Sequence, residues 1–222
     1  MYFCVGNATL LDVRCKPIGI LGAMSSQQVA QDATSRGGRG ARRRILDAAA
    51  ELFYREGINA TGVERLATES SVSKRTLYQH FPSKTAVVEE YLRRSEESLG
   101  NPTRAGSHSA DHRPRERLLA VFDIANLGGA PSRGCPFHNA AVEAAGTMPG
   151  VQKIVRTVKR NYVDGLTELA RQAGAADPAL LANELAVLYE GAAALATSLD
   201  DPSPWAHART AAKTLIDQAL AE

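Results

Sequence analysis

The spacing of the apolar residues limits the possible fold of this chain more than any other feature of the sequence. From Arg42 onward, apolar residues recur every three or four positions, which places them along one face of a helix. No segment after Met24 shows the sustained alternation of apolar and polar residues that is typical of half-buried β-strands. The sequence therefore predicts an all-α protein with about nine helices.

The first two predicted helices are bounded by capping residues. An amphipathic run that begins near Arg42 ends at Gly57, a residue type that favours the left-handed conformation after a helix. Thr61 and Glu64 have the spacing of a capping box, in which both side chains accept backbone N–H groups of the first turn. A short second helix is expected to start there.

Two more helices are predicted directly afterwards. Ser73 can cap a helix over residues 74–81, and Pro82 ends it because the residue before a proline is pushed out of helical geometry. Ser83 can cap the next helix, which extends to Gly100.

A second group of helices follows a linker or long loop over residues 101–113, which have no apolar stripe. The third helix of this group stops at a glycine, and the last two begin with a capping residue followed by proline. They are expected over residues 114–127, 136–145 and 151–173, with Gly174 ending the third, and after Asp177-Pro178 and Ser203-Pro204.

The composition excludes several classes of protein. Three cysteines among 222 residues are too few for a disulfide scaffold, and 18 glycines with 10 prolines are too few for a collagenous chain. The longest apolar runs fall far short of the roughly 18 residues that span a bilayer, so no membrane partner is expected.

Residues 1–40 are expected to form a disordered extension. The part before Met24 lacks the basic start, the continuous apolar stretch and the cleavage pattern of a secretion signal. We interpret residues 1–23 as the product of an upstream start codon and Met24 as the true start of the protein. The alternative is that residues 1–23 are a short disordered tail. Cys4 and Cys15 precede it, which leaves Cys135 alone in the expected folded part and indicates a reducing cytoplasm.

The charge is divided unevenly along the chain. The formal net charge is only +2, but residues 36–84 hold ten basic and five acidic side chains, a local +5. Residues 85–222 hold 14 basic and 17 acidic ones, a local −3. A basic segment of this kind can neutralise DNA phosphates, although an isolated arginine run can also be a solubilising tail.

Two short helices joined by a four-residue turn form a helix-turn-helix, whose second helix enters the major groove by its N-terminal residues. Here these residues are basic or hydroxylated, and both types bond base edges or phosphates. Tyr78 and His80 follow at spacings suited to phosphates, although packing against neighbouring helices is an alternative for both. The candidate DNA contacts are Arg42, Arg43, Thr61, Ser73, Lys74, Arg75, Thr76, Tyr78, His80 and Lys84.

The stretch from Arg44 to Phe53, with Gly57 and Thr61, and the stretch from Val72 to Lys84 resemble the DNA-binding domain of the tetracycline-repressor (TetR) family of transcriptional regulators. The resemblance covers residues 42–92. Two positions depart from the family pattern. Ser71 stands where the turn usually has glycine, and Arg75 stands where a small residue or proline is common.

The resemblance implies a DNA-binding domain over residues 41–92 and an effector-binding and dimerisation domain over residues 93–222. It further implies a homodimer through the last two helices and a small-molecule effector, without a cofactor. The expected function is sequence-specific regulation of transcription, as a repressor released from a pseudo-palindromic operator. An architectural DNA-binding protein without an effector is an alternative.

The chemistry of the C-terminal domain is less defined. Cys135 and His138 are three residues apart and could meet on one helical turn, which leaves a small helical enzyme as another alternative. Two such residues do not make a zinc site, so neither a metal nor catalysis is expected. The candidates for the effector pocket are Phe122, Asn126, Cys135, Phe137, His138, Tyr162 and Tyr189.

Overall fold

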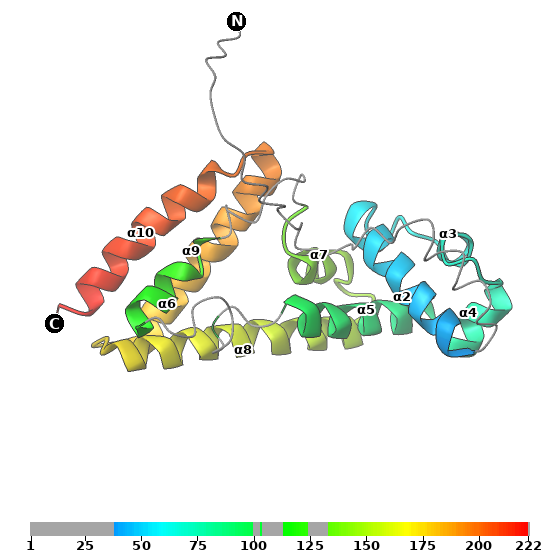
Figure 1. Ribbon diagram of the computed structural model, residues 1–222, viewed down its shortest axis with the longest axis horizontal. Helices are drawn as coiled ribbons and strands as arrows, with labels where there is room; N and C mark the ends of the chain where they lie inside the picture. Colours follow the sequence, from blue (N-terminus) through cyan, green and yellow to red (C-terminus); the bar gives the residue numbers. More distant parts are fainter. Residues whose placement is uncertain (1–37, 100–102, 104–112, 124–132, 222) are drawn as a thin grey trace, which may run out of the picture. The chain divides into compact units, whose positions relative to one another are not determined.

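The computed structural model describes residues 38–99, 103, 113–123 and 133–221. Within these ranges it contains nine helices and no strand, which confirms the all-α prediction (Figure 1). The helices are α2 (Gly38–Arg55), α3 (Val63–Glu69), α4 (Lys74–His80), α5 (Lys84–Leu99), α6 (Pro114–Ala120), α7 (Pro136–Glu143), α8 (Pro149–Ala173), α9 (Pro178–Leu199) and α10 (Ser203–Ala219).

The first hydrophobic core joins the four N-terminal helices to two later ones. Leu66 of α3, Leu77 of α4 and Leu92 of α5 are completely buried in it against α2. Phe137 of α7 and Val151 of α8 belong to the same core. We call helices α2 to α5 the head, and the described residues from Pro114 onward the body. The head is therefore closed on one side by two helices of the body.

The second core lies within the body, where α6, α9 and α10 pack with the later part of α8 (Figure 1). The side chains of Leu166, Leu185 and Ile216 are fully buried there. Helix α8 contributes to both cores, because Val155 packs in the first and Tyr162 in the second. The two cores thus meet within α8, and the domain boundary between residues 92 and 93 stays a prediction.

Local signals in the sequence place several helix ends correctly. The Ser73 side chain accepts the N–H of Thr76, and Asp177 accepts the N–H of Leu180, so both residues cap helices as predicted. Gly174 adopts the left-handed conformation after α8, with φ of 86°.

Two predicted caps are wrong. The capping position of α3 is Gly62, and the Thr61 hydroxyl instead donates to the carbonyl of Gly57 at 2.7 Å, because its side chain is turned into the core. Ser203 lies inside the first turn of α10, where its backbone N–H donates to the carboxylate of Asp201 at 2.9 Å.

Other boundaries also differ from the expectation. Helix α2 begins at Gly38, before Arg42, and α6 ends at Ala120 rather than at Leu127. The expected ends at Gly100 and Leu127 lie outside the described residues, as does most of the linker over residues 101–113.

Helix α9 has the length and composition of a membrane span, although the apolar runs alone predicted none. It is 22 residues long, and only 22% of its most apolar window is buried. The runs are interrupted by Glu184 and Glu190, which is why counting uninterrupted apolar residues missed it. A single helix of this kind is weak evidence for a membrane protein, and α9 packs against α8 and α10.

Candidate nucleic-acid interface and body pocket

The turn between α3 and α4 has the geometry of a helix-turn-helix. Ser71 is left-handed there, with φ of 52°, in the position where the family pattern has glycine. This conformation costs about 1 kcal/mol for a residue with a side chain. The turn is held from the outside by Arg44 of α2, whose Nε donates to the carbonyl of Ser70 at 3.0 Å. The angle between the two helices is therefore tied to α2.

Helix α4 buries one face and exposes the other. Leu77 is completely buried, whereas Lys74, Arg75 and Tyr78 are exposed. Gln79 is exposed as well, although it is not among the candidate contacts predicted from the sequence. Its position four residues after Arg75 was the available signal, because such residues share a helix face. An exposed row of arginine, tyrosine and glutamine can reach base edges and phosphates.

The hydroxyls of Ser73 and Thr76 at the start of α4 already form hydrogen bonds within the protein. Ser73 Oγ lies 2.9 Å from Thr76 Oγ1 and also accepts the Thr76 N–H at 3.0 Å. A hydroxyl that already shares a hydrogen bond can still accept or donate another to DNA. Contacts from these two residues to DNA remain predictions.

Lys74 forms an ion pair with Glu64 of α3, in which Nζ donates to Oε1. The hydrogen bond from Lys74 holds the pKa of the Glu64 carboxyl below its usual value. The same bond raises the pKa of Lys74. Arg75 differs from Lys74, because it forms no ion pair with any residue that the structure describes.

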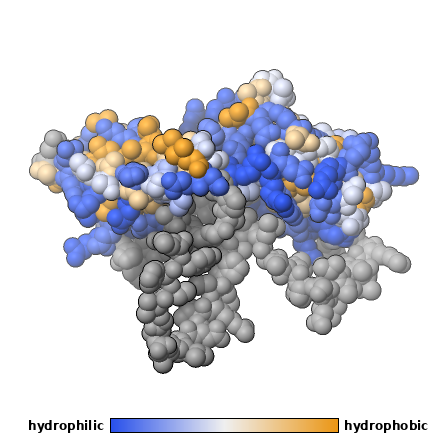
Figure 2. All heavy atoms as spheres, turned by 90° about the horizontal axis from the view of Figure 1, so that it is seen from above, coloured by the Kyte–Doolittle hydropathy of each residue, from blue (hydrophilic) through white to orange (hydrophobic). Residues whose placement is uncertain are grey.

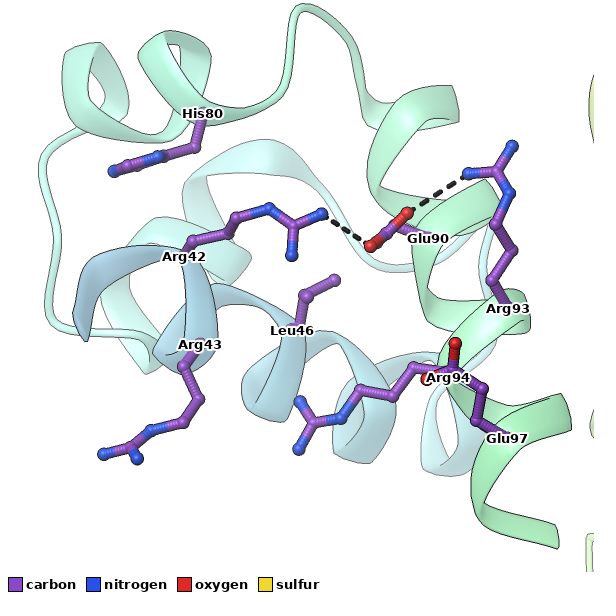
Figure 3. Close-up of a pocket in the computed structure, with 8 residues that line it drawn as sticks. All are labelled: Arg42, Arg43, Leu46, His80, Glu90, Arg93, Arg94 and Glu97. Carbon is purple, nitrogen blue, oxygen red and sulfur yellow. Dashed lines mark hydrogen bonds and ion pairs between the residues drawn. The ribbon is translucent and has the colours of Figure 1, made fainter. Parts of the chain in front are cut away.

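The start of α2 borders an open hollow of about 660 Å³, shared with α4 and α5 (Figure 3). Arg42 extends toward Glu90 of α5 and donates to it at 2.5 Å, and its guanidinium lies 5.3 Å from the ring centre of Phe81. Arg43 extends in another direction, and the half-buried His80 lies at the rim. Arg42 therefore links α2 to α5 in addition to any role at DNA.

Two of the candidate contacts are less accessible than expected. Thr61 is completely buried, so its side chain cannot touch DNA in this structure and that assignment is wrong. Lys84 is half-buried at the start of α5. Burial lowers the pKa of its ammonium, and the nearby carboxylate of Glu143 opposes the shift.

A second, smaller hollow of about 190 Å³ lies in the body between the start of α7 and α9. Cys135 and His138, two of the candidates for the effector pocket, line it. The Lys159 ammonium lies 3.6 Å from Cys135 Sγ and forms an ion pair with Glu190, which also lines the hollow. No hydrogen bond joins His138 to the thiol among the described residues, so the thiol–imidazole pair of the enzyme alternative is not formed in this structure.

Three other candidates form an aromatic cluster. The Tyr189 ring lies 5.3 Å from that of Tyr162, 6.3 Å from that of Phe122 and 5.1 Å from that of Trp205. The Tyr162 hydroxyl is buried and has no hydrogen-bond partner among the residues that the structure describes, and burial raises the pKa of this group far above its usual value. None of these rings lines the hollow beside Cys135.

The remaining two candidates do not contribute to that hollow. Phe137, the second residue of α7, is buried in the first core together with residues of the head. It does not line this hollow, and its place in an effector pocket stays a prediction. Asn126 lies outside the described residues.

The wall of the hollow is also bonded to the head. The Tyr54 hydroxyl of α2 donates to the carbonyl of Gly134 at 3.2 Å and accepts the N–H of Arg133 at 3.1 Å. At the far end of α7, the Glu143 carboxylate accepts the N–H of Asn59 at 2.6 Å. Since Arg133 and Gly134 line the hollow, its wall is in direct contact with α2.

No group of three or more histidine, cysteine, aspartate or glutamate side chains that could hold a metal ion occurs in the described ranges. The features that dominate the head are instead the exposed basic face of α4 and the turn that fixes its angle to α3. They define a helix-turn-helix DNA-binding protein.

Comparison with known proteins agrees with this class. Residues 45–91 match the family model described as bacterial regulatory proteins of the tetR family, and residues 114–212 match that of a tetracycline-repressor-like C-terminal domain. The chain belongs to the TetR family of transcriptional regulators, and its function is DNA-binding regulation of transcription.

Individual relatives cover different parts of the chain. It is 36% identical over 86 residues to the transcriptional activator FasR of Mycolicibacterium smegmatis, and 41% identical over 64 residues to the transcriptional repressor KstR2 of Rhodococcus jostii. These matches cover 37% and 29% of this chain but only 39% and 30% of those proteins. A crystal structure of a Tet-repressor-type regulator from Streptomyces avermitilis shares 32% identity with a TM-score of 0.69, over 81% of this chain and 97% of that one.

Proposed function

We propose that this regulator is a repressor that leaves its operator when a small molecule binds in the body. The observation that carries the proposal is the position of residues 133–135. This segment lines the hollow beside α9 and is also hydrogen-bonded to Tyr54 in the head. A ligand that displaces the segment must change contacts on α2, and with them the support of the helix-turn-helix.

Such release requires that the ligand bind the DNA-incompetent conformation more tightly, since equal affinity for both conformations shifts nothing. The hollow is small, with both a thiol and charged groups on its wall. We propose that the aromatic cluster around Tyr189 supports the adjacent wall of α9 rather than contacting the ligand itself.

We also propose a homodimer formed through α9 and α10. The apolar residues Leu180, Val187, Leu195 and Leu199 of α9 are between 54% and 72% exposed. Apolar surface gathers toward the α9–α10 side of the view in Figure 2. Exposed apolar residues along one helix in this way are typical of a protein interface. Pairing it with a second copy forms a four-helix bundle and accounts for the apolar character of α9 without a membrane.

A dimer would present two copies of α4, roughly 34 Å or a multiple of it apart, to successive turns of one face of the DNA. The operator is then a pseudo-palindrome. We assign Arg75, Tyr78 and Gln79 to the groove and its edges, and Arg43, His80 and Lys84 to phosphates. The place of action is the cytoplasm, with the DNA.

Selection of genomic fragments at physiological salt, followed by footprinting, tests the DNA-binding part of the proposal. We expect a small set of sites with one palindromic sequence. Binding that is sensitive to salt but indifferent to sequence would instead support the architectural alternative. A reporter gene placed behind the selected site then tests repression, because the relatives FasR and KstR2 are an activator and a repressor.

A further inference from the structure

The ion pair between Glu64 and Lys74 lies where the head is expected to meet DNA. Glu64 is in the first turn of α3 and Lys74 is the first residue of α4, so the pair joins the two helices of the helix-turn-helix. The two side chains are 72% and 54% exposed. Their carboxylate and ammonium are therefore both accessible to a DNA backbone that approaches this surface.

An exposed carboxylate at this position opposes phosphate binding in two ways. It repels phosphates directly, and it occupies the ammonium group that would otherwise neutralise one of them. Arg75 is the next residue of α4 and forms no ion pair within the described residues. In the first turn of α4, Lys74 is thus held in an ion pair by Glu64, whereas Arg75 has no such pair among the described residues and is available for DNA.

We propose that Glu64 is a specificity-determining residue that suppresses binding to non-operator DNA by holding Lys74. Binding to non-specific DNA depends almost entirely on cations that neutralise phosphates. Binding to the operator also draws on base contacts, here those of Arg75 and its neighbours, and does not require the ion pair to open. The carboxylate therefore weakens non-specific complexes more than the specific complex, and specificity is the difference between the two. This inference rests on the DNA-binding function.

The experiment compares the wild-type protein with Glu64→Gln on two DNA probes. The first is a 30-bp duplex of random sequence, and the second is the site selected by the wild-type protein. Replacing the carboxylate with an isosteric amide frees Lys74 for one phosphate. One added phosphate contact makes the salt slope of log K steeper by about 0.9, which corresponds to about eightfold tighter binding at 0.1 M salt for each head engaged.

We expect this gain on random DNA and a smaller gain on the selected site, so the ratio of the two affinities falls. The matched control is Glu69→Gln, which removes the same charge from the same helix but from a carboxylate paired with Arg65. It should change the affinity for random DNA by less than Glu64→Gln does. Equal effects of the two variants would mean that only net charge matters and would overturn the proposal.

A second comparison isolates the role of Lys74. In a Lys74→Met background, Glu64→Gln should steepen the salt slope by clearly less than it does in the wild-type background. An undiminished effect would also overturn the proposal. Failure of the wild-type protein to bind either probe would instead contradict its DNA-binding function, and the two failures are therefore distinguishable. Circular dichroism melting of every variant verifies that the helices are retained.

Discussion

The hydroxyl of Tyr54 in α2 bridges two consecutive residues of the body, since it donates to the Gly134 carbonyl at 3.2 Å and accepts the Arg133 N–H at 3.1 Å. Gly134 is left-handed, with φ of 76°, and a side chain there would come within 2.9 Å of the hydroxyl oxygen of Thr197 in α9. One short segment thus fits closely between the head and α9. This arrangement predicts which residue transmits a change in the pocket to the DNA-binding helices.

Replacing Tyr54 with phenylalanine should separate pocket occupancy from DNA release. N-ethylmaleimide attached to Cys135 serves as the probe, because the thiol lines the hollow and is only half-buried. We expect alkylation to lower the operator affinity of the wild-type protein and to lower that of Tyr54→Phe by clearly less. Cys135→Ser treated in the same way controls for labelling elsewhere. An equal loss in both labelled proteins would show that Tyr54 does not transmit the change.

Arg75 should read one position of the operator. The Arg75→Ala variant is expected to lose about 1–3 kcal/mol of binding free energy on the selected site and to tolerate any base at one position of each half-site. Binding of the variant to a library with every single-base change measures both effects. A uniform loss across all sequences would instead identify Arg75 as a phosphate contact.

Ser71 should limit the stability of the head. Because it is left-handed, with φ of 52°, Ser71→Gly is expected to raise the free energy of unfolding by about 1 kcal/mol. Urea denaturation measures the change. Ser71→Ala is the control and should bring no gain, since alanine keeps the Cβ atom that disfavours this conformation. A gain from both variants would trace the effect to the serine hydroxyl.

The apolar face of α9 should determine the oligomeric state. Val187 is 72% exposed in the chain, and Val187→Glu is expected to convert a dimer into a monomer and to weaken operator binding. Light scattering coupled to size-exclusion chromatography measures the mass. Val142→Glu is the matched control, because Val142 of α7 is 64% exposed but lies on another helix. Dimers that persist in Val187→Glu would place the interface elsewhere.

The sequence by itself determined the features that depend on neighbours a few positions away. The spacing of apolar residues predicted the helices, and capping residues such as Ser73 and Asp177 were identified because their partners lie three residues along the chain. The basic face of α4 was predictable from the same short-range spacing, and the family pattern, which has glycine at the position of Ser71, agrees with the left-handed conformation found there. This local information was also sufficient to recognise the helix-turn-helix and its family.

Only the tertiary structure decided which of these residues meet across the chain. It buried Thr61 instead of exposing it as a cap, and it packed Phe137 with the head instead of beside the pocket. The bridge from Tyr54 to Gly134 joins residues 80 positions apart. The hydroxyl of Thr61 and the ring of Phe137 find their surroundings only when distant helices close a core, and helical periodicity does not specify which helices those are.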